Sequence, residues 1–223
     1  MSRGTDAMDR SVRRTGLALL LALGLTGCKF VETAELTAAA EAAATARQAK
    51  TASLDDWSGK VLPHMRDKAV PVATVAAALA RGLEDAGAQY GYREGGEGTP
   101  FSYAVVVDGK IVEANTESRA ATAGVDTDGD GAADVTLQLG PVIRGTAIRD
   151  VLPFISFTDF ENQIEFAQVA KALNTEAYDT VLADLPRDAL VGSTVHAIGA
   201  VTVRKAGETL LVTPVEIGIE AAS

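Results

Sequence analysis

Four aspartates lie within nine residues of this chain, in the segment Asp126-Thr127-Asp128-Gly129-Asp130-Gly131-Ala132-Ala133-Asp134. Aspartates at loop positions 1, 3, 5 and 9, with glycine at position 6, match the first part of an EF-hand-like calcium loop. A hard cation takes several oxygen ligands, and carboxylates this close repel one another unless a cation lies between them. The candidate ligands are Asp126, Asp128, Asp130, the backbone carbonyl of Ala132, and Asp134.

The match to a calcium loop is incomplete, because Leu137 stands where an EF-hand has its bidentate glutamate. We therefore expect a weak Ca²⁺ site, with a Kd on the order of 10⁻⁴–10⁻³ M, that pins the loop between two strands. The alternative is an acidic turn that uses aspartate and glycine only for their backbone geometry. No other cofactor is expected.

A second group of polar residues follows this loop. Two arginines stand five positions apart in the run from Gly140 to Asp150, and an Asn-Gln pair follows a cluster of phenylalanines. Arginine suits bidentate binding of a carboxylate or phosphate, so these side chains could bind a ligand or a partner. The alternative is structural: the arginines pair with Asp150 or Glu165, and the Asn-Gln pair satisfies the start of a helix. The candidate residues are Arg144, Arg149, Asn162 and Gln163.

Paired carboxylates raise the possibility of acid–base catalysis. Asp150, Asp159 and Glu165 could serve a periplasmic or cell-wall hydrolase in this way, but helix capping and surface positions explain them equally well. His64 and His196 have no metal-ligand or nucleophile spacing, and no phosphate-binding loop or nucleophile elbow occurs. The sequence therefore favours a protein that is not an enzyme, with a hydrolase as the alternative.

The amino terminus has the pattern of an exported lipoprotein. Arginines at 10, 13 and 14 precede an apolar run from Leu17 to Leu25, which is too short to span a bilayer. The run ends in Leu25-Thr26-Gly27-Cys28, a lipobox. We expect residues 1–27 to be a signal peptide and Cys28 to be acylated, which places the protein outside the cytoplasm on a membrane anchor. An ordinary signal peptide with a chance cysteine is the alternative.

Charge and cysteine content limit the possible functions. The whole chain carries −10, of which the leader with four arginines and two aspartates contributes +2, so the remainder carries about −12. Such an acidic body argues against nucleic-acid binding and against lying flat on anionic lipid. The acyl chains on Cys28 should therefore make the contact with the lipid bilayer. Cys28 is the only cysteine, which excludes a disulfide and a cysteine metal site.

Helical patterns fill the region before residue 99. Residues 28–52 are rich in alanine and are expected to form a tether or helix. Residues 53–92 form a helical extension, in which Trp57, Val61 and Met65 lie on one stripe of a first helix. A second helix is expected from Val72 to Gly87 or Gly91.

Strand patterns dominate residues 99–220. Strands are expected at 101–107, 119–125, 134–139, 194–203 and 209–217. Residues 110–114 either form a further strand after a turn at Asp108-Gly109 or continue the first strand past a bend. Helices are expected from Thr158 or Asp159 to Leu173 and over 175–185. The order predicts an α+β protein with an OB-like five-stranded barrel and a helical block between strands three and four, where a helix would plug the barrel.

Several of these features together resemble a family of bacterial predicted periplasmic lipoproteins. They are the lipobox, Trp57, the Asp-rich loop, the run Gly140–Thr146, Arg149-Asp150, Phe160, Asn162-Gln163, Leu173-Asn174 and Thr213-Pro214-Val215. The resemblance implies an OB-fold-like domain and frequent encoding beside components of sugar-type ABC transporters, which are the expected partners. It implies no established activity and no catalytic residue. The expected function is that of an accessory or binding module linked to sugar uptake.

Overall fold

The computed structural model describes residue 44 and residues 56–221 of the chain. The signal peptide, Cys28 and most of the alanine-rich tether lie outside the described residues. The helical parts before the barrel are η1 (Trp57–Val61), α2 (Leu62–Lys68), α3 (Val72–Arg81) and α4 (Leu83–Tyr90). The strands are β1 (Val70–Pro71), β2 (Phe101–Asn115), β3 (Ala120–Asp126), β4 (Val135–Pro141), β5 (Thr194–Val203) and β6 (Leu210–Glu220). Between β4 and β5 lie α5 (Ala147–Asp150), η2 (Phe157–Asp159), α6 (Gln163–Ala177) and η3 (Tyr178–Leu182).

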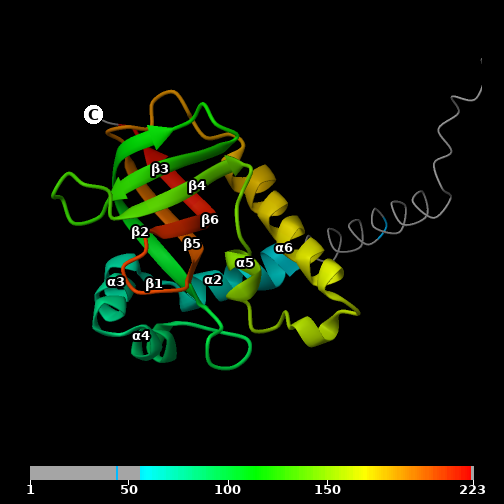
Figure 1. The fold of residues 1–223 in the computed structure, drawn as a ribbon. Helices are drawn as coiled ribbons and strands as arrows, with labels where there is room; N and C mark the ends of the chain where they lie inside the picture. Colours follow the sequence, from blue (N-terminus) through cyan, green and yellow to red (C-terminus); the bar gives the residue numbers. More distant parts are fainter. Residues whose placement is uncertain (1–43, 45–55, 222–223) are drawn as a thin grey trace, which may run out of the picture. The chain divides into compact units, whose positions relative to one another are not determined.

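Five strands close into a barrel (Figure 1). β2 pairs antiparallel with β3, and β3 pairs antiparallel with β4. β2 also pairs antiparallel with β5 over its first ten residues, and β4 pairs parallel with β6. Because β5 and β6 pair antiparallel with each other, the barrel is closed. Together with the helical block between β4 and β5, this is the expected OB-like plan.

Alternating side chains fill the barrel interior. Tyr103, Val105 and Val107 of β2 lie in the same buried cluster as Leu137 of β4 and Val201 of β5. The opposite face of β2 and β5 presents small residues such as Ala104 and Ala200, which belong to a second buried cluster with the helices. This period of two follows from the pleat of a strand.

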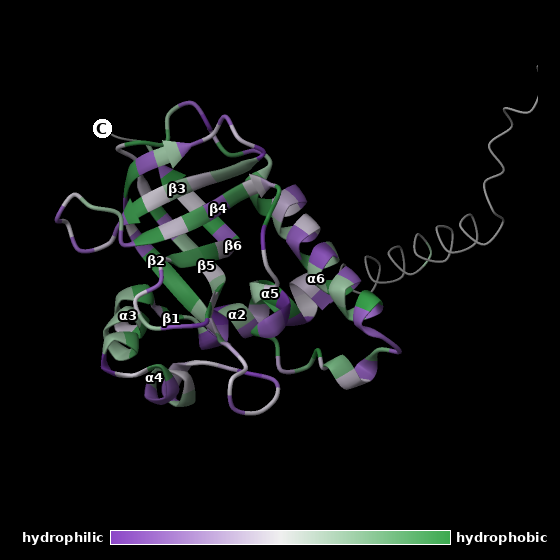
Figure 2. Cartoon of the chain, viewed as in Figure 1, coloured by the Kyte–Doolittle hydropathy of each residue, from purple (hydrophilic) through white to green (hydrophobic). Residues whose placement is uncertain are grey.

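The helix that packs onto the barrel interior is not the one expected. Val72, Val75 and Leu79 of α3, before the barrel, belong to the interior cluster. α6 instead lies on the outer face, where Val169 and Leu173 pack in the second cluster with α2 and α5 (Figure 1). Hydrophobic and hydrophilic residues intermix along α6 (Figure 2), as expected for a helix with one buried side.

The structure corrects two local expectations and decides between the two alternatives left open for residues 110–114. Gly82 divides the expected helix 72–91 into α3 and α4. Residues 101–115 form one continuous strand, so the alternative of a single bent strand holds and the register shift falls between Ile111 and Glu113. α6 begins after Asn162, not at Thr158 or Asp159. Within residues 56–221, no helix is long and apolar enough to cross a bilayer.

Candidate functional site

The acidic loop between β3 and β4 brings three of the candidate ligands together. Carboxylate oxygens of Asp126, Asp128 and Asp130 lie within 4.8 Å of one another. The Asp126 carboxylate is buried and accepts backbone N–H groups from Asp128 (3.2 Å), Gly129 (2.7 Å) and Gly131 (2.9 Å). The hydrogen bond from the Gly129 N–H is the main cause that lowers the pKa of Asp126. Three converging acidic groups could hold a small cation.

The other two candidate ligands take different positions. The Asp134 carboxylate accepts hydrogen bonds from the backbone and hydroxyl of Thr127, each at 2.7 Å, and stands outside the acidic group. The backbone N–H of Ala132 donates to Asp130 at 2.7 Å. The loop is therefore closed by its own hydrogen bonds, with Asp128 and Asp130 exposed at its surface.

Arg149 is held at the outer face of the barrel. Its Nε and Nη2 donate to one oxygen of Asp150 at 2.8 and 2.6 Å, and its Nη1 donates to the Phe166 carbonyl at 3.0 Å. The guanidinium carbon also lies 3.6 Å from the centre of the Phe166 ring. The Arg149 side chain is only 11% exposed, so these contacts fix its position.

Arg144 contributes its backbone to the structure and leaves its side chain in solvent. Gln138 accepts from the Arg144 N–H at 2.8 Å and donates to the Arg144 carbonyl at 3.0 Å. The same Gln138 amide donates to Thr213 of β6 at 2.8 Å, which ties the segment to the barrel. The Arg144 guanidinium is exposed and makes no ion pair or hydrogen bond with any described residue.

Asn162 and Gln163 differ in position, since the first caps a helix and the second lines a concave surface. Asn162 caps α6, because its side-chain oxygen accepts the N–H groups of Ile164 and Glu165 at 2.9 and 3.0 Å. Gln163 lines an open hollow of about 560 Å³ together with Arg149 and Phe157. Arg149 and Gln163 are thus brought together, whereas Arg144 and Asn162 do not line this hollow.

The three candidate acid–base residues are separately engaged. Asp150 pairs with Arg149 and accepts the Thr146 hydroxyl. Asp159 accepts the Ser156 N–H at 3.1 Å, and Glu165 accepts the Glu161 N–H at 3.1 Å.

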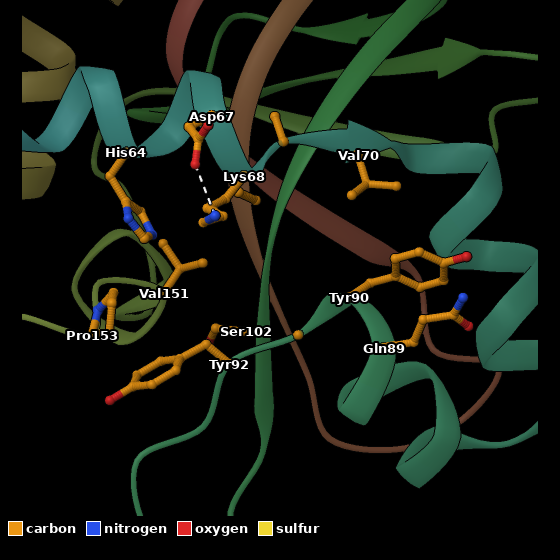
Figure 3. A pocket seen from close by; sticks show the side chains of 13 residues that line it. His64, Asp67, Lys68, Val70, Gln89, Tyr90, Tyr92, Ser102, Val151 and Pro153 are labelled. Carbon is orange, nitrogen blue, oxygen red and sulfur yellow. Dashed lines mark ion pairs between the residues drawn. The ribbon is translucent and has the colours of Figure 1, made fainter.

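A cavity that the sequence did not indicate lies between α2, α4 and β2 (Figure 3). Its volume is about 440 Å³, and we call it the helix cavity. Aromatic, polar and apolar side chains from four separate segments line it, including His64, Gln89, Tyr90, Tyr92, Ser102 and Val151. A tyrosine on each side of Gly91 was the one sequence signal that could have pointed to it.

His64 connects the helix cavity to the segment after α5. Its ring meets the exposed Phe154 ring edge-on, with centroids 5.7 Å apart. Burial lowers the pKa of His64, and this outweighs a hydrogen bond to the Val151 carbonyl that favours the protonated form. Because its pKa is lowered, the His64 imidazole is neutral at pH 7 and can both donate and accept a hydrogen bond. On the rim of the cavity, Lys68 and Asp67 form an ion pair at 2.8 Å.

A smaller cavity of about 200 Å³ shares Tyr92 with the helix cavity. Arg93, Arg149 and Arg204 line it together with Glu94 and Asp150, and we call it the arginine cavity. Arg93 lies 4.2 Å from the Phe101 ring centre and pairs with Glu84 through both terminal nitrogens, each at 3.1 Å.

Comparisons with known proteins agree with this architecture. Residues 18–218 match the model of a family described as predicted periplasmic lipoprotein (DUF2291). The chain also resembles the crystal structure of an OB-fold protein from Thermotoga maritima, with a TM-score of 0.63 and 22% sequence identity, over 77% of this chain and 98% of that chain. No curated protein matches the chain.

The chain belongs to this family of predicted periplasmic lipoproteins, because the match covers most of its length. The family description agrees with the lipobox at residues 25–28, and it places the protein on the periplasmic side as a membrane-anchored lipoprotein. The structural likeness establishes the OB fold.

Proposed function

We propose that the protein is an anchored, non-enzymatic binding module that holds a small sugar in the helix cavity. The observation that carries this proposal is the cavity itself, whose volume of about 440 Å³ falls in the range of small-molecule sites. Its walls come from α2, α4, β2 and the segment after α5, so packed secondary structure would hold a ligand in place (Figure 3).

The lining chemistry suits a sugar ring. A sugar has C–H groups on its faces, which pack against aromatic rings, and hydroxyl groups at its edge. Tyr90, Tyr92 and His64 supply aromatic surface, while Gln89 and Ser102 supply hydrogen-bond donors and acceptors. A neutral His64 suits this role, since an uncharged imidazole nitrogen can accept a hydrogen bond from a sugar hydroxyl.

The proposal that the module is not an enzyme rests on its carboxylates. Asp150, Asp159 and Glu165 are each held by backbone or side-chain donors. Of the three, only Asp150 lines the arginine cavity, where it pairs with Arg149. The second carboxylate of that cavity, Glu94, accepts the Ser156 hydroxyl and the Phe157 N–H. A hydrolase with a pair of carboxylates needs both of them at one cleft.

We further propose that the module serves a sugar-type ABC uptake system. The periplasmic localisation supports this proposal. The family resemblance described above also supports it, because it implies that transporter genes lie beside this gene. Deleting the gene should then slow uptake of the sugar carried by the adjacent transporter, and the wild-type gene should restore it. Unchanged uptake in the deletion strain would contradict the transporter link.

A structural role for Ca²⁺ in the acidic loop is also part of the proposal. The grouping of Asp126, Asp128 and Asp130 supports it. The cation would stiffen the loop between β3 and β4 and would have no part in binding sugar, because none of these aspartates lines the helix cavity.

Calorimetric titration of the anchored protein in detergent, against a panel of neutral monosaccharides and disaccharides, tests the binding proposal. Gln89 is exposed on α4 and lines the helix cavity, so Gln89→Trp should block the cavity and abolish binding. The matched control is Ala88→Trp, an exposed neighbour on the same helix that does not line the cavity, and it should bind normally. No binding by any sugar, or equal binding by both variants, would contradict the proposal.

A further inference from the structure

The arginine cavity contains more cationic donors than the surrounding protein uses. A guanidinium carries five N–H donors. Arg149 uses three of them, two on Asp150 and one on the Phe166 carbonyl, and Arg93 uses two on Glu84. The guanidinium of Arg204 makes no hydrogen bond or ion pair with residues 56–221.

Two of these arginines are largely withdrawn from solvent. The side chains of Arg93 and Arg149 are 20% and 11% exposed. Unused donors on such groups are unfavourable unless a partner reaches them. The cavity gives a partner access to them, because all three arginines line it.

The acidic residues of the cavity are engaged by other groups. Glu94 accepts the Ser156 hydroxyl and the Phe157 N–H, the latter at 2.8 Å. Asp150 accepts from Arg149 and Thr146. Three guanidinium groups and two carboxylates line the cavity. Arg93 is paired with Glu84 and Arg149 with Asp150, so the Arg204 guanidinium is the lining cation without an acidic partner among residues 56–221.

We infer that the arginine cavity is an anion subsite that takes a carboxylate or phosphate group. Guanidinium groups bind both of these planar or tetrahedral anions through paired hydrogen bonds. Tyr92 lines this cavity and the helix cavity alike, so the two cavities are neighbours at this residue. This inference rests on the proposed function. An anion subsite next to the helix cavity makes the ligand a sugar that carries an acidic group, either a sugar acid or a sugar phosphate.

Calorimetric titration of the anchored protein in phosphate-free buffer tests the subsite with three probes: inorganic phosphate, glucuronate and glucose. Phosphate alone should bind, and Arg204→Ala should weaken it about tenfold or more, since the variant removes charge-assisted hydrogen bonds. The control is Lys205→Ala, an exposed neighbour that removes the same charge but lines neither cavity, and its affinity should be unchanged.

The outcomes separate the subsite from the proposed function. Glucuronate binding more tightly than glucose, with the difference lost in Arg204→Ala, supports a sugar acid, whereas tight phosphate binding without preference for glucuronate supports a phosphate group. Phosphate binding that is sensitive to Arg204→Ala, with no sugar bound, supports the anion subsite and overturns the sugar proposal. Sugar binding without any anion preference, or equal loss in Arg204→Ala and Lys205→Ala, overturns the anion subsite.

Discussion

Arg144 and Arg149 lie five positions apart in one segment, yet their surroundings differ. Arg149 is mostly buried, paired with Asp150 and stacked on Phe166, whereas the Arg144 side chain is exposed and has no partner among the described residues. The energetic importance of an arginine depends on such partners, because breaking a buried pair leaves a charge without compensation.

Replacing Arg149 should therefore destabilise the fold, and replacing Arg144 should not. We expect Arg149→Ala to cost about 2–4 kcal/mol of unfolding free energy, since Asp150 loses its cation and Phe166 its stacked group. Arg144→Ala should stay within about 0.5 kcal/mol of the wild type. Denaturant unfolding of the two variants gives the comparison, and equal stability would contradict the structural role of Arg149.

His64 predicts a loss of stability in mild acid. Burial lowers its pKa from the usual value of 6.5, so the unfolded chain takes up this proton more readily than the native protein. The stability is complete above about pH 6.5 and declines as the pH falls below it. Melting curves between pH 7.5 and pH 5 should show this decline in the wild type and not in His64→Gln.

His196→Gln is the control for this titration, because His196 is the other histidine and its side chain is exposed beside Asp108. This variant should keep the decline of the wild type. A decline that survives in His64→Gln and disappears in His196→Gln would assign the effect to His196 and contradict the prediction for His64.

The acidic loop between β3 and β4 makes its own prediction. If Ca²⁺ binds there, calcium at tenfold excess over its Kd stabilises the protein by about 1.4 kcal/mol, which raises the melting temperature by several degrees. Asp128→Ala combined with Asp130→Ala should remove that gain, since both side chains belong to the acidic group and are exposed. Thermal unfolding with and without calcium measures it, and an unchanged wild-type melting temperature would leave only the turn interpretation.

The β-strands were predictable because their pattern is local. Alternating apolar residues such as those of β2 and β4 give the correct faces. Asp108-Gly109 suggested a turn, but Gly109 lies within β2. A Cβ at this position would lie 2.2 Å from the Asp126 carbonyl oxygen, so a residue with a side chain does not fit there. The glycine permits close strand approach at that point, and a turn motif does not distinguish this use from a true turn.

The helices and the cavities were less predictable, because they depend on contacts distant in sequence. The pattern of α3 could not reveal that its apolar face would join the barrel interior in place of α6. The helix cavity combines His64, Tyr92, Ser102 and Val151, whose proximity is created only by the fold. The same holds for Arg187, which donates to the carbonyls of Leu139, Gly140 and Leu182 and joins the end of β4 to the helical block.

At the scale of the whole molecule, the chain combines an acidic body with an amino-terminal anchor signal. With a net charge of about −12 after the leader, which is −10 for the whole chain less the leader's +2, the body gains little from anionic lipid, so membrane attachment should depend on acylation of Cys28. We expect Cys28→Ser to abolish incorporation of labelled palmitate and to release the protein from the membrane fraction or leave it unprocessed. A variant that still incorporates palmitate and stays with membranes would contradict the lipobox assignment.

A crystal structure of the protein with its best-binding sugar would locate the ligand directly. The proposed function predicts a sugar ring in the helix cavity, in contact with Tyr92 and His64, with any acidic group directed into the arginine cavity. A sugar bound on the outer surface of β3 and β4, or in the hollow beside Gln163, would contradict it.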